Sequence, residues 1–82
     1  MEKTQPRTFF SGNIAVISEY GSHWTTYYFS LCGIDYFLVH TLEAPYWELM
    51  MFNQETHVYI PVVSGVRAVR EWLTHHTMPG II

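Results

Sequence analysis

Three residues of this 82-residue chain could together perform nucleophilic chemistry: Cys32, Asp35 and His40. A thiol needs a base to activate it and a third group to orient that base. If Cys32 and His40 share one face of a hairpin, they still lie about 13 Å apart along the strand at ~3.3 Å per residue, too far for a hydrogen bond. The sequence therefore predicts no catalytic residue and no enzyme. A small-ligand binder or enzyme that uses Cys32 and His40 is the least favoured alternative.

Histidines are frequent enough to raise the question of a metal site. They are His23, His40, His57, His75 and His76. None follows the HxxxH or HExxH spacing, and no CxxC pair accompanies them. Glu71 and His75 could offer two ligands on one helical face, but the negative end of a helix dipole explains a histidine there equally well. The turn at Ser64 lacks the glycines and lysine of a phosphate loop, so we expect no metal and no cofactor.

The basic residues lie only near the two ends of the chain. Lys3, Arg7, Arg67 and Arg70 are the four of them, so residues 8–66 contain neither lysine nor arginine. The same stretch holds Glu19, Asp35, Glu43, Glu48 and Glu55. Binding to DNA or RNA requires Lys and Arg to neutralise phosphates, so this distribution argues against direct nucleic-acid binding. It favours a partner with a basic surface.

Size and composition indicate one small folded domain. Of the residues, 49% are hydrophobic and 13% are charged, which excludes an intrinsically disordered chain. The lone Cys32 cannot form an internal disulfide, and no basic leader precedes an apolar stretch at the N-terminus. The apolar runs are shorter than the roughly 20 residues that a membrane helix needs. We expect a cytoplasmic protein with no membrane contact.

The hydrophobic pattern predicts strands followed by one helix. Residues 1–8 are polar and should form a flexible lead-in, and 9–82 should form a single domain. The expected strands are about 13–20, 23–32, 36–41, 47–52 and 56–63, and the expected helix is about 65–76 with Ser64 as its N-cap. We choose strand over helix for 47–52 because six residues are short for a helix. The fold class is α+β, an antiparallel, meander-like sheet of four or five strands with the C-terminal helix packed on one face.

The aromatic hairpin over residues 23–41 should organise the sheet. A three-residue loop over 33–35 would pair Leu31 with Phe37, Phe29 with Val39, and Tyr27 with Thr41 on the core face. The other face would then carry Tyr28, Ser30, Cys32, Tyr36, Leu38 and His40. In the next hairpin, the core set is Trp47, Leu49 and Met51. The outward set there is Glu48, Met50, Phe52, His57, Tyr59 and Pro61.

One helix cannot cover a sheet of this size on both sides, so an aromatic surface is left for a partner or a second copy. Tyrosine, tryptophan and methionine are enriched at interface centres. The predicted partner-binding residues are Tyr28, Tyr36, His40, Glu48, Met50, Phe52, Glu55, His57 and Tyr59.

These features favour a non-enzymatic interaction module. It would be a small inhibitor or regulator that docks an acidic, aromatic surface on a basic site of a larger protein, such as a nucleic-acid-binding complex. In size, acidity and lack of a catalytic motif, the chain resembles the small inhibitors of phages and mobile elements, including anti-CRISPR and anti-restriction proteins. A homodimeric regulatory or structural domain, whose aromatic face is its own interface, is the alternative.

Overall fold

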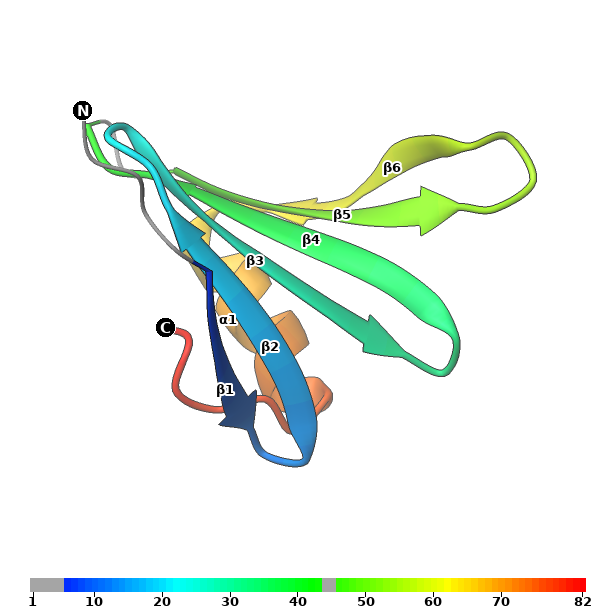
Figure 1. Ribbon diagram of the computed structural model, residues 1–82, viewed down its shortest axis with the longest axis horizontal. Coiled ribbons are helices and arrows are strands. Elements are labelled where there is room, and N and C mark those ends of the chain that lie inside the picture. The colour runs from blue at the N-terminus through cyan, green and yellow to red at the C-terminus, as the bar shows by residue number, and fades with distance from the viewer. Residues whose placement is uncertain (1–5, 44–45) are drawn as a thin grey trace.

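The protein is a six-stranded antiparallel meander with one helix, as described for residues 6–43 and 46–82 in a computed structural model (Figure 1). Its elements are β1 (Arg7–Ser11), β2 (Ile14–Tyr20), β3 (Trp24–Leu31), β4 (Ile34–Thr41), β5 (Tyr46–Asn53), β6 (Val58–Ser64) and α1 (Val66–His75). Each strand pairs with its sequence neighbours, so the strand order is β1-β2-β3-β4-β5-β6. The α+β class and the C-terminal helix are confirmed. The expected count of four or five strands is wrong.

The additional strand is β1, whose residues fall partly in the expected lead-in over 1–8 and partly in the stretch before the expected strand over 13–20. Gly12 (φ 61°) and Asn13 form a tight turn, and Ser11 then pairs with Ile14. Glycine adopts this left-handed conformation at no steric cost, so the chain reverses here instead of continuing as one strand. Arg7 therefore belongs to the sheet, not to a lead-in over 1–8; residues 1–5 of that prediction lie outside the described residues.

The hairpin of β3 and β4 has a different register from the expected one. Cys32 (φ 51°) and Gly33 (φ 79°) form a two-residue turn, so Leu31 pairs with Ile34. The type I′ form of the two-residue hairpin turn has positive φ at both central positions, and Cys32 supplies one of them although it is not glycine. The partner of Leu31 is thus Ile34 and not Phe37, a shift of three positions. Because side chains alternate with a period of two, an odd shift exchanges the two faces of β4.

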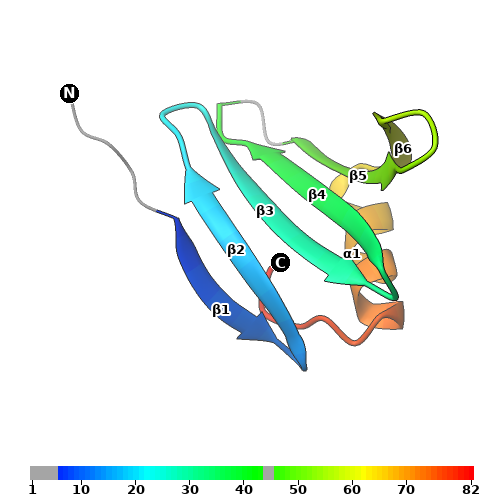
Figure 2. The ribbon, with the colours of Figure 1, turned by 45° about the vertical axis from the view of Figure 1, so that its right-hand side comes forward.

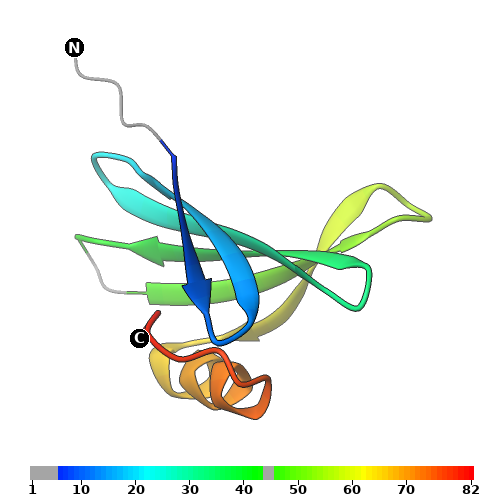
Figure 3. The same cartoon turned by 60° about the horizontal axis from the view of Figure 1, so that its bottom comes forward.

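The core lies between the sheet and α1. It contains Val16, Phe29, Leu38, Trp47, Leu49, Val69, Leu73 and Met78. Val69 and Leu73 come from the expected apolar stripe of the helix, and the core face of β5 is the expected one. Figures 2 and 3 show that α1 and the C-terminal segment lie on the same side of the sheet. No element of residues 6–43 and 46–82 covers the other side.

Both ends of α1 are anchored to the sheet. The amide of Gly65 donates to the Trp47 carbonyl at 2.7 Å, immediately before the helix begins. The prediction of Ser64 as N-cap is wrong, because Gly65 is the N-cap and no side chain caps the helix. After the helix, Met78 is only 2% exposed, and Ser11 Oγ donates to the Pro79 carbonyl at 2.6 Å. The C-terminal segment is therefore the layer that covers β1 and β2.

The ten-residue α1 is the helix of the described chain, and no helix there has the length and apolar character needed to cross a membrane.

Candidate functional site: the uncovered face of the sheet

The three residues considered for nucleophilic chemistry do not come together. Cys32 is exposed at the tip of the β3–β4 hairpin. His40 lies near the other end of β4, where its ring stacks on Trp47 with centroids 3.9 Å apart and planes within 7°. At ~3.3 Å per residue, the six positions from Ile34 to His40 span about 20 Å. Asp35 instead accepts a hydrogen bond from Ser30 Oγ at 2.5 Å.

The histidines have separate local contacts. His23 Nδ1 lies 2.6 Å from a carboxylate oxygen of Glu43, which joins the loops that precede β3 and β5. His76 stacks on the Trp72 ring at 3.7 Å and donates from Nδ1 to its carbonyl at 2.8 Å. Within residues 6–43 and 46–82, no group of three His, Cys, Asp or Glu side chains is arranged to hold a metal ion.

We call the side of the sheet opposite α1 the open face. Strand alternation and the observed register assign to it Thr8, Phe10, Ala15, Ile17, Glu19, Trp24, Thr26, Tyr28, Ser30, Asp35, Phe37, Val39, Thr41, Tyr46, Glu48, Met50, Phe52, Tyr59 and Pro61. Its charged side chains are all carboxylates. Arg67 and Arg70 are exposed on α1, on the opposite side of the sheet. The two sides of the protein therefore differ in the sign of their charge.

Aromatic rings form a continuous group across the open face. The centroids of Tyr28 and Phe37 are 5.9 Å apart, those of Phe37 and Tyr59 are 4.7 Å apart, and those of Phe52 and Tyr59 are 5.2 Å apart. These rings come from β3, β4, β5 and β6, so the register of three strand pairs positions them. Tyr28 is 37% exposed and Tyr59 is 44% exposed. A large part of the group is in contact with water.

The predicted partner-binding residues separate into three places. Tyr28, Glu48, Met50, Phe52 and Tyr59 lie on the open face, as expected from the sequence. Glu55 and His57 lie in the exposed turn between β5 and β6.

Tyr36 and His40 were expected on the open face and lie instead on the helix-covered face. The Tyr36 ring packs 5.4 Å from that of Phe29 and 5.2 Å from that of Trp72. The changed register of the β3–β4 hairpin is the reason, and it also moves Leu38 into the core and Cys32 into the turn. The same change brings Phe37 and Val39 to the open face, where the sequence prediction did not put them. Gly33 marks a turn, but a cysteine before it lacks the Asn-Gly or Asp-Gly signal of a two-residue hairpin turn, so the local sequence did not identify them.

The potential near Tyr28 is negative. Its hydroxyl donates to a Glu19 carboxylate oxygen at 3.3 Å. The pKa of Tyr28 is raised above its ordinary value of 10.0 by partial burial first, then by the charge of Glu19 and this hydrogen bond, and by Tyr59. On the covered face, burial and then Tyr20 raise the pKa of Tyr27. Burial is the largest cause of the raised pKa for both tyrosines, and a carboxylate contributes only to that of Tyr28, on the open face.

The sheet is not flat at the open face. The β2–β3 ladder runs only from the Ile17–Tyr28 pair to the Tyr20–Thr25 pair, so the tips of the β1–β2 and β3–β4 hairpins diverge (Figure 1). The groove between them has a volume of about 620 Å³, and its open-face lining includes Ala15, Ser30 and Asp35. The open face therefore has a groove as well as exposed apolar side chains.

No family model, no curated protein and no solved structure matches this chain.

Proposed function

We propose that the protein is a non-enzymatic interaction module whose open face docks on a basic surface of a larger protein. One observation supports this most strongly: among the described residues, one side of the sheet carries no covering element and presents aromatic side chains without lysine or arginine, while α1 packs on the other side. Monomeric proteins rarely leave large contiguous apolar patches in water, and such patches commonly mark interaction sites. Trp, Tyr, Phe and Met are the side chains that interface centres favour.

Charge favours a basic partner. Glu19, Asp35 and Glu48 are the charged side chains of the open face. Their field would accelerate encounter with a positively charged surface and slow encounter with a negatively charged one. The phosphates of DNA and RNA carry the same sign as these carboxylates, which disfavours a nucleic acid as the direct ligand.

The same charges argue against a second copy as the occupant. A two-fold dimer through the open face would bring this patch against itself, with Glu19 and Glu48 of one copy near those of the other. Like charges that are buried against each other are costly. A complex with a different protein is therefore favoured over a homodimer, and sedimentation distinguishes the two.

An inhibitor or regulator is the role that this arrangement suits. A small chain that covers a basic surface blocks access to that surface, and a basic surface is what nucleic-acid-binding proteins present to phosphates. The proposal thus keeps the expected role of a small regulator that acts on a nucleic-acid-binding complex. It assigns no catalytic step to the protein.

The experiment is quantitative affinity capture from the source cell, with the wild-type chain and two variants. Tyr28→Asp combined with Tyr59→Asp adds charge to the aromatic group of the open face. Val66→Asp is the matched control, because Val66 is 46% exposed and lies at the start of α1 on the other side. Circular dichroism checks that all three chains are folded.

We expect one basic protein to be retained by the wild type and by the Val66→Asp chain, and to be lost by the double variant. Purified partner and chain should then bind with an association rate that falls as salt increases. Retention of the same proteins by the double variant would overturn the proposal. A wild-type dimer in sedimentation that the double variant converts to a monomer would replace it with the homodimer.

A further inference from the structure

The register aligns two glutamates across four neighbouring strands of the open face. Glu19 pairs with Thr26, Thr26 with Val39, and Val39 with Glu48, so these four residues form one row from β2 to β5. With ~4.8 Å between neighbouring strands, the Cα atoms of the two glutamates are about 14 Å apart. Thr26 and Val39, between them, are short side chains.

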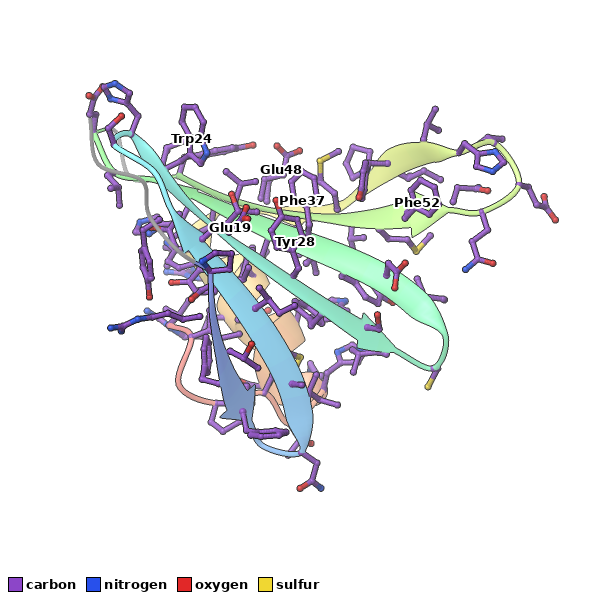
Figure 4. The ribbon with its side chains drawn as sticks, in the orientation of Figure 1. Glu19, Trp24, Tyr28, Phe37, Glu48 and Phe52 are labelled. Carbon is purple, nitrogen blue, oxygen red and sulfur yellow. The ribbon has the colours of Figure 1, made fainter. Side chains whose placement is uncertain are left out.

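The rows on either side of this one carry large rings. Tyr28 pairs with Phe37 on one side, and Trp24 pairs with Thr41 on the other. Together they enclose a hollow of about 330 Å³ that is lined by Trp24, Thr26, Tyr28, Phe37, Val39 and Thr41. Figure 4 shows Trp24 toward one end of the sheet, with Tyr28, Phe37, Glu19 and Glu48 beside one another further along it. We call this feature the Trp24 hollow.

We propose that the Trp24 hollow is a binding pocket for the guanidinium group of an arginine side chain. This inference rests on the proposed function, since the arginine would belong to the basic partner. Aromatic faces attract cations, and arginine makes such contacts more often than lysine. A planar guanidinium can stack on a ring and direct its N–H donors sideways to carboxylates at the same time, which a compact, strongly hydrated ammonium cannot do.

The pocket is organised before any ligand enters. The hydrogen bond from Tyr28 to Glu19 holds one carboxylate beside the ring, and the contact of Tyr28 with Phe37 holds the two rings together. Thr26, at the floor, is buried, so the depth of the hollow is set by the backbone of β3 and β4. Preorganisation of this kind reduces the entropy that a ligand must lose to order the site.

No arginine or lysine of the described residues lies at the Trp24 hollow. Arg67 and Arg70 are on α1, on the opposite side of the sheet, and Arg7 alternates toward the covered face of β1. Glu19 and Glu48 flank Thr26 and Val39 of the hollow in the strand register, and no lysine or arginine that the structure describes lies beside them on the open face. Trp24, which is 51% exposed, forms a wall that is open to an incoming side chain.

The test is a titration of the isolated chain with three short peptides, Ac-Gly-Xaa-Gly-NH₂, in which Xaa is arginine, lysine or citrulline. The indole Nε1–H of Trp24 gives a distinct NMR signal at the pocket wall. We expect saturable binding of the arginine peptide in the millimolar range, a weaker response to lysine, and no saturable response to citrulline, which has a similar shape without charge.

Variants locate the site. Glu48→Gln should weaken binding of the arginine peptide about fivefold, the effect of one charge-assisted contact at a partly exposed site. Glu71→Gln is the matched control, because Glu71 is an exposed carboxylate on α1, and it should leave the affinity unchanged. Equal affinity for arginine and lysine, or for arginine and citrulline, would overturn the proposal. So would an affinity that Glu48→Gln does not change.

This titration needs no protein partner, so its failure differs from failure of the proposed function. If the arginine peptide does not bind while Tyr28→Asp with Tyr59→Asp still abolishes capture of the partner, the docking face is right and the arginine pocket is wrong. If the peptide binds but capture does not depend on the open face, the pocket is right and the proposed function is wrong.

Discussion

The two faces of the sheet are built from similar side chains and differ in what they contact. On the covered face, Tyr36 lies between the rings of Phe29 and Trp72, and α1 closes the layer above them. On the open face, Tyr28 and Tyr59 contact other rings of the same face, with water above them. An aromatic residue in a strand is therefore evidence of function only after its face is known. The same residue type stabilises the fold on one side and is available to a partner on the other.

The largest effect should come from the centre of the covered face. Leu49 is fully buried among β5, β6 and α1, so Leu49→Ala should lower the free energy of unfolding by about 3 kcal/mol through lost burial and a cavity. Ile17→Ala on the open face should cost less than about 1 kcal/mol, since Ile17 is 43% exposed. Chemical denaturation followed by tryptophan fluorescence measures both. Equal losses would contradict the assignment of the core to one face.

The placement of Tyr36 on the covered face can be tested by comparing alanine substitutions of two tyrosines that lie on opposite faces of the sheet. Tyr36→Ala should cost about 2 kcal/mol because it removes ring contacts beneath α1. Tyr59→Ala should cost less than about 1 kcal/mol, because its ring is partly in water. If Tyr59→Ala instead lowers the free energy of unfolding more than Tyr36→Ala in the same denaturation experiment, the assignment of Tyr36 to the covered face and Tyr59 to the open face is wrong.

The C-terminal segment extends the covered layer to β1, and Gly12 tests that contact. A Cβ at Gly12 would meet the Thr77 carbonyl oxygen, and the residue has φ 61°, so Gly12→Ala should destabilise the fold by about 1.5 kcal/mol. Gly33 is the matched control, because it also has positive φ but has open space around it; Gly33→Ala should cost only the backbone strain of about 1 kcal/mol. Thermal denaturation measures both losses of stability. A smaller loss for Gly12→Ala than for Gly33→Ala would contradict the packing of the C-terminal segment against Gly12.

The smallest effect concerns alkaline pH. Tyr27 and Tyr28 have folded pKa values raised above 10.0, so the folded state prefers their neutral phenols. Their contribution to stability is present below about pH 10 and is lost as the pH rises through the raised values. Glu19→Gln keeps an acceptor for the Tyr28 hydroxyl but removes the charge, so it should lower the pKa of Tyr28 and leave that of Tyr27 unchanged. NMR titration of the two rings checks this, and an unchanged Tyr28 would mean that burial alone raises its pKa.

Local sequence was sufficient for much of the architecture. The strand over 47–52 and the helix over 65–76 were correctly predicted, and the predicted bounds of the remaining strands agree with the structure to within two residues. The outward positions of Glu48, Met50 and Phe52 followed from alternation along β5, where the hydrophobic pattern has one consistent reading. Five of the nine predicted partner-binding residues accordingly lie on the open face. The prediction failed where the pattern is aromatic on both faces, as on β4.

The sequence by itself determined the α+β class and the absence of basic charge from residues 8–66, because secondary-structure propensity and charge are properties of each residue and its neighbours. Only the tertiary structure decided whether Tyr36 or Phe37 faces water, because Cys32 adopts a left-handed conformation that its residue type rarely takes. The resulting turn shifts the register of β4 by an odd number of residues, which exchanges its two faces. The tertiary structure also decided that Met78 is buried, since that depends on where the chain runs after α1. The Trp24 hollow depends on these long-range choices, because four strands must align to place two glutamates beside three rings.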